Sequence, residues 1–567
     1  MNQTGKGNSI TKGELEAIRD KYRQRRYDEC IREVKSKLKQ SPNSLHLLNY
    51  QAMAYTALKR DKDALLVYQK IVKKDPSLAG PYYNMGIILK RNGRIEEAIS
   101  SYKRAISLKP DYVQAYNNLG VLYKDSEKYE DAIKMFTSAK ELQSDHQNSY
   151  YNLALIKKEQ GQSEEAIELL LKVLDLNPEH GEAKYDIAMI KKDKGLLEEA
   201  KNYLQDILNS DRKNQEAVAS LAKVYSEMGN FNCAISSLRK AINANPKNRI
   251  LYHNLGLCLV TIGKFEEGWR AIESIWEEDD RKRSNFYKEA KKIWKGNKTT
   301  KNLVLWKRQQ GIGEDIIFLS LLPEVKEMCA TLSVYVDPRL QTLCRHAMPD
   351  INFVKDIKEL QKVDCEYHLP IQSLGGLIRN DISDFDRTVK GYLKADPKRV
   401  EALRNELQLG GKTVIGISWK STQTKYKTKS IQLRDMERIF SGLDVVLVNL
   451  QYGDVEDEIR EFKEATGIEV LQCASVDNRE DLDGLAALIE ACDLVVSTSN
   501  VTVHLAGALA KETWVLLHYV SIYYWLIERT DSIWYPSLSL YRQPTLDDWD
   551  SVYGSIRKDL EIRLQCN

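Results

Sequence analysis

Two acidic residues follow a pair of glycines in the segment QQGIGEDIIF. Gly311 and Gly313 predict a tight turn that leads from a strand into a helix. Glu314 and Asp315 then fall in the first turn of that helix, where either carboxylate can accept the proton of an attacking hydroxyl group. The alternative is that the two acids only complement the positive end of the helix dipole.

A basic cluster lies in the segment GISWKSTQTKYKTKSI. A predicted strand ends just before Lys420, and Ser421 and Lys429 follow in the next loop. Cations placed after a strand suit a diphosphate group. When a bond to a nucleotide diphosphate breaks, negative charge grows on the departing group, and a fixed ammonium group in a dry cleft offsets that charge.

A third cluster lies in STSNVTVHLAGALA, which predicts a strand end, a loop and the start of a helix. Thr502 and His504 stand at this helix start, and helix N-termini attract phosphate groups. His504 either donates to a phosphate oxygen or lies in the core, bonded to a neighbouring carbonyl group. Gln451, after the strand of NLQ, either meets a base or a ribose or stabilises its own turn.

The elements that must position these clusters begin at Lys301. Short apolar runs there alternate with helical segments, a pattern typical of parallel strands connected by helices. A second series begins at TVIGISW and continues to ETWVLLH. We therefore expect two doubly wound units, joined near residues 395–412, with the ligand in the cleft between them.

The first half of the chain repeats with a period of 34 residues. In each repeat, apolar residues at helical spacing flank a polar break, which predicts a helix, a turn and a second helix. The period is marked by Pro42, Pro76, Pro110, Pro178 and Pro246, and small residues recur at Ala64, Ala98, Ala132, Ala166, Ala200 and Ala234. Residues 8–275 resemble tetratricopeptide repeats, seven or eight of them, and such units stack into a solenoid with a binding groove.

A row of polar residues occupies one position on the first helix of the repeats: Asn84, Asn118, Asn152 and Asn254. Helical geometry directs this position away from the seam between helices, so the amides are available to a guest. An amide has both donors and an acceptor, so the row can hold the backbone of an extended peptide. The alternative is that these amides reflect the repeat consensus and face water.

Composition narrows the classes of function. The 84 basic and 81 acidic residues leave a net charge of +3, too even for sequence-independent binding of nucleic acid. A hydrophobic share of 43% in 567 residues predicts a globular protein with several cores. All tryptophans fall between Trp269 and Trp549, which indicates a domain boundary near residues 265–285.

Several features predict a cytoplasmic protein. The N-terminal segment lacks the apolar core of a secretory signal, and the apolar stretch Thr513–Ile527 is too short to cross a membrane. The nine cysteines are scattered without a CxxC pair, which argues against a disulfide framework or a zinc ribbon. No cluster has the spacing of metal ligands, and we expect no cofactor and no metal.

Longer motifs carry a resemblance to a known family. These are FEEGW, KIWKG, LVLWKRQQGIGEDIIFLSLLPE, GISWKS, NLQYGD, DLVVSTSNVTVHLAGALA and SIWYPSLSLYRQ. Nearly the whole chain resembles bacterial glycosyltransferases of the GT-B fold in which tetratricopeptide repeats precede a domain related to heptosyltransferases. Flagellin glycosyltransferases share this domain order, and O-linked N-acetylglucosamine transferase is a more distant relative with a similar asparagine ladder.

The resemblance implies the fold class and the domains: an all-α tetratricopeptide-repeat superhelix over residues 1–275, a linker over 276–300, and an α/β GT-B domain. Its N-terminal Rossmann-like unit spans 301–410, and its C-terminal nucleotide-sugar-binding unit, with a terminal helix, spans 411–567. The resemblance also implies that the residue after the turn, Glu314, is the catalytic base. Lys420, Ser421 and Lys429 would contact the diphosphate.

The implied activity is an inverting, metal-independent transfer of a sugar from a nucleotide-sugar donor to Ser or Thr hydroxyls of a protein held in the repeat groove. Two alternatives stay open. The acceptor is a glycan or small molecule and the repeats recruit a partner, or the chain is a non-catalytic scaffold. The family pattern reads Gly-Asp and Asp-Thr-Gly-x-x-His, whereas this chain has Glu314 and Ser499-Asn500-Val501.

Overall fold

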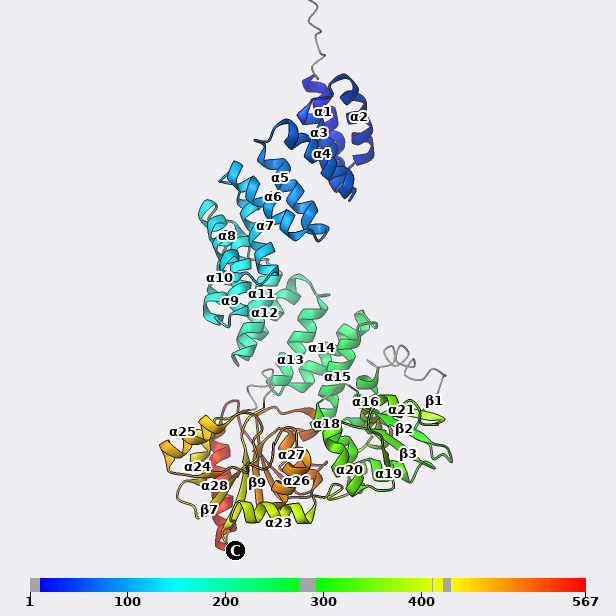
Figure 1. Ribbon diagram of the computed structural model, residues 1–567, viewed down its shortest axis with the longest axis vertical. Coiled ribbons are helices and arrows are strands. Elements are labelled where there is room, and N and C mark those ends of the chain that lie inside the picture. Colours follow the sequence, from blue (N-terminus) through cyan, green and yellow to red (C-terminus); the bar gives the residue numbers. More distant parts are fainter. Residues whose placement is uncertain (1–10, 275–291, 309–310, 410, 422–429, 567) are drawn as a thin grey trace, which may run out of the picture. The chain divides into compact units, whose positions relative to one another are not determined.

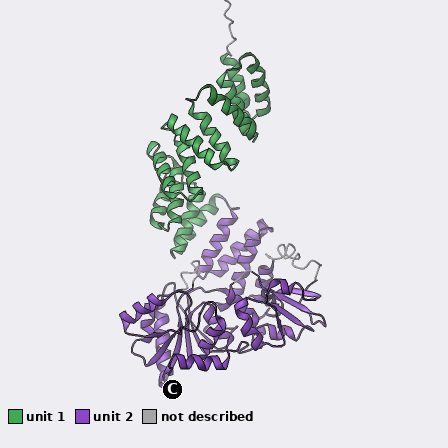
Figure 2. Ribbon diagram, in the orientation of Figure 1, with its two compact units in different colours: residues 1–210 green, residues 211–567 purple. Residues whose placement is uncertain are grey.

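The computed structural model describes residues 11–274, 292–308, 311–409, 411–421 and 430–566. The chain divides into two compact units, residues 1–210 and 211–567 (Figure 2). The division falls inside the repeats, because the last four repeat helices group with the α/β region.

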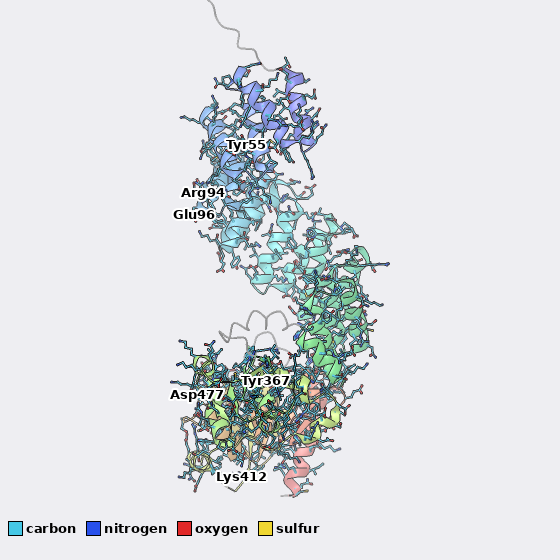
Figure 3. All side chains as sticks on the ribbon, turned by 90° about the vertical axis from the view of Figure 1, so that its right-hand side faces the viewer. Tyr55, Arg94, Glu96, Tyr367, Lys412 and Asp477 are labelled. Carbon is cyan, nitrogen blue, oxygen red and sulfur yellow. The ribbon has the colours of Figure 1, made fainter. Side chains whose placement is uncertain are left out.

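The first unit consists of antiparallel helix pairs. Its helices are α1 (Lys12–Arg23), α2 (Tyr27–Gln40), α3 (Leu45–Ala57), α4 (Asp61–Lys74), α5 (Ala79–Arg91), α6 (Ile95–Leu108), α7 (Val113–Asp125), α8 (Tyr129–Leu142), α9 (Gln147–Glu159), α10 (Ser163–Leu176), α11 (Gly181–Asp193) and α12 (Leu197–Ser210) (Figure 1). Each helix buries one face. Helix α6 buries Ala98 and Tyr102. Glu96 of this helix and Arg94, its N-cap, are exposed (Figure 3).

Small residues set how closely the paired helices approach. A Cβ atom at Gly120 of α7 would lie 2.7 Å from the ring of Phe136 on α8. Phe136 is fully buried, so its ring has no space to retreat into. Gly120 is therefore a contact point between the two helices of this pair.

The second unit begins with two more helix pairs, α13 (Gln215–Glu227) with α14 (Phe231–Ala244), and α15 (Arg249–Thr261) with α16 (Phe265–Glu273). Helix α16 packs directly on the α/β region. The indole nitrogen of Trp269 donates to the carbonyl of Arg379 at 2.8 Å, and the rings of Phe265 and Phe385 lie 5.0 Å apart.

Two parallel sheets follow. The first has the order β1-β5-β2-β3-β4 and the second β11-β10-β9-β6-β7-β8. The strands of the first are β1 (Lys292–Ile293), β2 (Leu303–Trp306), β3 (Leu332–Tyr335), β4 (Asn352–Phe353) and β5 (Tyr367–Pro370); those of the second are β6 (Thr413–Ser418), β7 (Val445–Asn449), β8 (Val470–Leu471), β9 (Leu494–Thr498), β10 (Thr513–Leu517) and β11 (Leu538–Arg542). The central strands are apolar and buried on both faces, as parallel sheets require.

Helices connect the strands and cover the sheets. The longer ones are α18 (Ile312–Leu319), α20 (Gln341–Ala347), α23 (Pro397–Glu406), α25 (Glu456–Thr466), α26 (Leu482–Ala491), α27 (Val501–Ala508) and α28 (Trp549–Cys566); the shorter are α19 (Leu322–Lys326), α21 (Ile357–Leu360), α22 (Gly375–Ile378) and α24 (Glu437–Phe440). The C-terminal helix α28 packs on the second sheet and on α24. The predicted fold class, tetratricopeptide repeats followed by two Rossmann-like units, is confirmed.

We expect Gly120→Ala to destabilise the protein by about 1–3 kcal/mol, because the added methyl group overlaps the ring of Phe136. Gly80→Ala is the matched control, since nothing lies within 4 Å of a Cβ atom at that helical position. It should be neutral or stabilising by about 0.5 kcal/mol. Urea melts followed by circular dichroism measure both, and equal midpoints for the two variants would contradict the packing argument.

Candidate functional site

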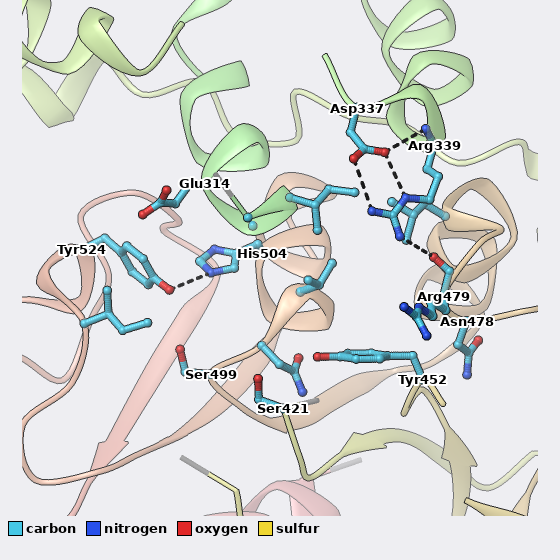
Figure 4. Close-up of a pocket in the computed structure, with 17 residues that line it drawn as sticks. Glu314, Asp337, Arg339, Ser421, Tyr452, Asn478, Arg479, Ser499, His504 and Tyr524 are labelled. Atoms are coloured by element: carbon cyan, nitrogen blue, oxygen red, sulfur yellow. Dashed lines mark hydrogen bonds and ion pairs between the residues drawn. The ribbon is translucent and has the colours of Figure 1, made fainter. Parts of the chain in front are cut away.

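A cavity of about 490 Å³ lies in the second unit, where the carboxyl ends of strands from both sheets meet. Its lining comes from both sheets: Gly311, Ile312, Gly313, Glu314, Asp337 and Arg339 from the first, and Ser421, Tyr452, Asn478, Arg479, Leu482, Ser499, Asn500, Val501, His504, Ile522 and Tyr524 from the second. Figure 4 shows Glu314, His504 and Tyr524 at one end and Arg339, Arg479 and Asn478 at the other. The expected cleft between two Rossmann-like units is therefore present.

The glycine turn brings α18 against α27. Gly311 caps α18, and a Cβ atom at Gly313 would lie 2.7 Å from Cδ2 of His504. Glycine at 313 is therefore needed for the two helices to touch. Glu314 lines the cavity, and the hydroxyl group of Tyr523 donates to its Oε1 over 3.4 Å.

Asp315 differs from its neighbour, although the sequence put both acids in the same turn. Its carboxylate is fully buried, accepts from Gln372 at 3.0 Å and pairs with Lys307 at 3.0 Å. Burial raises the pKa of Asp315 to about 6, although the charge of Lys307 opposes this shift. Asp315 does not line the cavity, so the structure leaves Glu314 as the carboxylate of this turn that does.

The basic loop is described only in part. Lys420 does not line the cavity; its ammonium group pairs with Glu458 at 2.5 Å, and Trp419 donates to the same carboxylate at 2.7 Å. The expected contact between Lys420 and a diphosphate therefore competes with an acid already in place. Ser421 does line the cavity, and Lys429 lies outside the described residues.

Gln451 follows the second of its two predicted roles. Its side chain is buried, and its oxygen accepts from the Ser418 hydroxyl and from the backbone N–H groups of Trp419 and Lys420, each at 2.9 Å. Its nitrogen donates to the carbonyl of Tyr452 at 3.0 Å. Gln451 therefore ties the end of β6 to the loop after β7, and it is not among the residues that line the cavity.

At the start of α27, Asn500 is the N-cap and accepts from the backbone N–H of Thr502 at 3.0 Å. Thr502 is fully buried, and its hydroxyl donates to the carbonyl of Leu450 at 3.3 Å, so the side chain is turned away from the cavity. His504 lines the cavity, but it is 98% buried, stacks on Trp525 with centroids 5.4 Å apart, and bonds two tyrosine hydroxyls.

The far end of the cavity holds residues that sequence reasoning did not select. Arg339 donates to Asp337 at 3.0 Å and to the carbonyl of Arg479 at 3.1 Å, so it joins the two sheets across the cavity. The amide nitrogen of Asn478 donates to two backbone carbonyls, while its buried oxygen has no hydrogen-bond partner among the described residues. Asp337 and Tyr452 each follow a strand, the signal that would have identified them.

The asparagine ladder is half-buried and engaged between successive repeats. Asn118 donates to the hydroxyl of Tyr83 at 3.2 Å, and Asn152 donates to Asn117 at 3.3 Å; each partner stands 35 residues earlier. The expectation that the amides are available to a guest is therefore corrected for these two positions, and Asn84 is half-buried. The fourth, Asn254, is half-buried on α15 of the second unit.

Comparisons with known proteins identify the repeats. Family models described as TPR repeat or tetratricopeptide repeat match residues 15–79, 67–100, 88–126, 111–179, 158–224 and 216–248. A curated relative, protein FlbA of Caulobacter vibrioides, is 28% identical over 330 residues, which cover 53% of this chain and 52% of FlbA. The chain thus spans about half the length of that relative.

Solved structures resemble parts of the chain. MamA is 25% identical and covers 28% of this chain and 94% of its own, with a TM-score of 0.27. YrrB, described as a TPR protein with an unusual peptide-binding site, is 25% identical and covers 33% and 96%, with a TM-score of 0.29. Pseudomonas aeruginosa PilF is 16% identical and covers 36% and 94%, with a TM-score of 0.33. Fold and family models together define a tetratricopeptide-repeat protein with a C-terminal α/β region.

The described residues contain neither a membrane-spanning helix nor a cluster of metal ligands. Within them, no helix combines the length and the apolar composition needed to cross a membrane. Across the same residues, no three His, Cys, Asp or Glu side chains gather as they would around a metal ion.

The raised pKa of Asp315 predicts a pH-dependent stability. Between its ordinary value of 3.8 and about 6, the folded state holds a proton that the unfolded state has released, so wild-type stability falls as pH rises through this interval. Asp315→Asn does not titrate. The free energy of unfolding of the variant relative to wild type should therefore rise from pH 4 to pH 6 and then level off, by a difference on the order of 3 kcal/mol. Parallel curves in paired thermal melts would show that Asp315 is not buried as described.

Proposed function

We propose that this protein is an inverting, metal-independent glycosyltransferase that moves a sugar from a nucleotide-sugar donor to Ser or Thr hydroxyls of a protein acceptor. The observation that carries the proposal is the cavity at the carboxyl ends of two parallel sheets, lined by the carboxylate of Glu314. Ligands bind at this edge in doubly wound folds, and a base placed there meets the reacting groups.

The proposed reaction needs one proton acceptor and a stabilised leaving group. Glu314 takes the proton of the acceptor hydroxyl as the oxygen attacks the anomeric carbon from the face opposite the nucleotide. The bond from that carbon to the diphosphate oxygen breaks, and the nucleoside diphosphate departs with the electron pair. Cations stabilise its negative charge. Arg479 lines the cavity, and Lys429 is the further candidate from the sequence.

The far end of the cavity supports a nucleotide there. Tyr452 offers an aromatic ring on which a base can stack. Arg479, beside Asn478, adds positive charge for the phosphate groups, whereas Arg339 is already paired with Asp337.

The repeats support a protein acceptor, because tetratricopeptide repeats present extended surfaces for peptides and proteins. An amide has two donor hydrogens and an acceptor oxygen. Asn118 uses one donor hydrogen for its contact to Tyr83, whereas Asn152 uses both, for Asn117 and for the carbonyl of Asn148. A bound peptide would therefore compete with, or extend, the bonds that Asn118 and Asn152 already make.

A non-catalytic scaffold is the second candidate, and two observations favour it. The ammonium group of Lys420 is paired with Glu458, and the ring nitrogens of His504 bond tyrosine hydroxyls. Two residues at family positions for donor phosphates thus have partners within the protein.

In the remaining alternative the protein is still a glycosyltransferase. Its acceptor is then a glycan or small molecule, and the repeats recruit a partner.

Glu314→Gln tests the enzyme. The variant should keep the rise in melting temperature caused by a nucleoside diphosphate and lose sugar transfer by about 100-fold or more, because the amide cannot take the proton. Intact-mass analysis of acceptor proteins reports the transfer. Asp315→Asn is the matched control and should keep most activity. If wild type shows no melting shift with any nucleotide, the scaffold is favoured instead.

Replacing Asn84, Asn118 and Asn152 together by Ala tests the acceptor site. We expect transfer to a protein acceptor to weaken on the order of 100-fold through KM, as three lost amide contacts at about 1 kcal/mol each imply. Hydrolysis of the donor in the absence of acceptor should stay unchanged. Equal losses in both reactions would contradict a peptide held on the repeats.

A further inference from the structure

One segment of the second unit contacts both the last repeats and the cavity. This connecting segment, residues 519–527, follows β10 and includes the short helix η7 (Tyr523–Trp525). On the repeat side, Val520 and Ile527 pack against the apolar cluster of α13 to α15. On the other side, Ile522 and Tyr524 line the cavity. A single layer of side chains therefore separates the last repeats from the cavity.

Tyr523 occupies the middle of this segment and contacts the carboxylate of the proposed base. Its hydroxyl group donates to Oε1 of Glu314 over 3.4 Å, a long bond of the kind that shortens when an active site closes on its substrate. Burial and the charge of Glu314 raise the pKa of Tyr523 well above its ordinary value. The hydroxyl group therefore keeps its proton and acts as a donor.

The ring of Tyr523 is in turn placed by the last repeat helix. It meets the indole of Trp269 edge to face, with centroids 6.0 Å apart and planes at 88°. Trp269 belongs to α16, is 96% buried and is fixed by its bond to the carbonyl of Arg379. Glycines at 375 and 376 give Trp269 its space, since an added Cβ atom would lie 3.2 Å from the indole at position 375 and 3.2 Å from the Cβ atom of Trp269 at position 376.

Arg542 fixes the remainder of the connecting segment. Its guanidinium group donates to the carbonyl oxygens of Leu526 at 2.8 Å, Trp525 at 3.3 Å and Tyr519 at 3.5 Å. Burial lowers the pKa of Arg542 to about 10. Gln543 accepts from the backbone N–H of Tyr519 at 3.1 Å. The segment is thus held at both ends, and it presents Tyr523 in a defined position.

We propose that Tyr523 is a positioning residue that orients the Glu314 carboxylate, and that the repeat helix α16 sets Tyr523 through Trp269. The inference rests on the proposed function, in which Glu314 is the base. It gives the last repeats a second task besides acceptor binding, since the order of residues from α16 to the base is Trp269, Tyr523, Glu314. A misplaced base slows transfer without weakening the donor, because orientation acts on the chemical step.

Tyr523→Phe tests the positioning. The ring stays and the hydroxyl group goes, so kcat should fall on the order of 10- to 100-fold, while KM for the donor and the nucleotide-induced melting shift stay unchanged. A crystal structure of the variant should show the Glu314 carboxylate in a new rotamer. Tyr541→Phe is the matched control. It removes a tyrosine bond to a carboxylate, Tyr541 to Asp559 at 2.8 Å, on β11 and α28, and should keep kcat.

Trp269→Phe and the double variant test the link to the repeats. Trp269→Phe should also lower kcat. The kcat of the double variant should be no lower than that of Tyr523→Phe alone, because both substitutions act through one contact. Additive losses, or a Tyr523→Phe structure with Glu314 unmoved, would overturn the proposal. If wild-type protein transfers no sugar, the glycosyltransferase proposal fails, and the crystal structure of Tyr523→Phe still decides whether the hydroxyl group orients Glu314.

Discussion

The close contact of α18 with α27 is the constraint on which the cavity depends. Gly313 leaves no Cβ atom between the helix and the ring of His504, so the N-terminal turn of one Rossmann-like unit rests on a helix of the other. Two tyrosine hydroxyls hydrogen-bond the ring of His504, and the ring of Trp525 stacks on it. A larger side chain at 313 would separate the helices and open the cavity along its length.

The same region joins three parts of the second unit into one core. Apolar side chains of α15 and α16, of the first sheet and of the second sheet belong to a single buried cluster. Helices α15 and α16 join this core through their contacts with η7 and α22. The last repeats are thus structural components of the α/β region, which explains why the compact unit begins at residue 211.

Glu314 and Asp315, neighbours in one turn, carry their charges in different surroundings. Asp315 points inward to Lys307, and Lys307 is shared with Asp337, whose other partner is Arg339. Glu314, one residue earlier, lines the cavity and meets Tyr523. A buried carboxylate needs such partners because desolvation disfavours its charge. The two acids of this turn therefore have different surroundings, one buried beside Lys307 and one facing the cavity.

Periodicity in the sequence was sufficient for the repeats, for the two strand-helix series and for the position of the cleft, because spacing along a helix or strand determines which residues are buried together. It also selected the turn at Gly311 and Gly313 and the acids after it. Periodicity could not determine the direction in which each side chain points. Three of the selected residues, Gln451, Thr502 and Lys420, are each next in sequence to a residue that lines the cavity. Their side chains nevertheless bond to partners elsewhere.

Those partners come from distant parts of the chain, so only the tertiary structure decided between competing bonds. Lys420 pairs with Glu458, and Tyr523 donates to Glu314, which lies 209 residues earlier in the chain. Arg339 donates to the backbone carbonyl of Arg479. The sequence by itself determined the repeat architecture and the parallel sheets, because these follow from local periodicity. Which acid faces the cavity, and what holds it there, was decided by long-range packing, because a polar group bonds to whichever partner folding brings within reach.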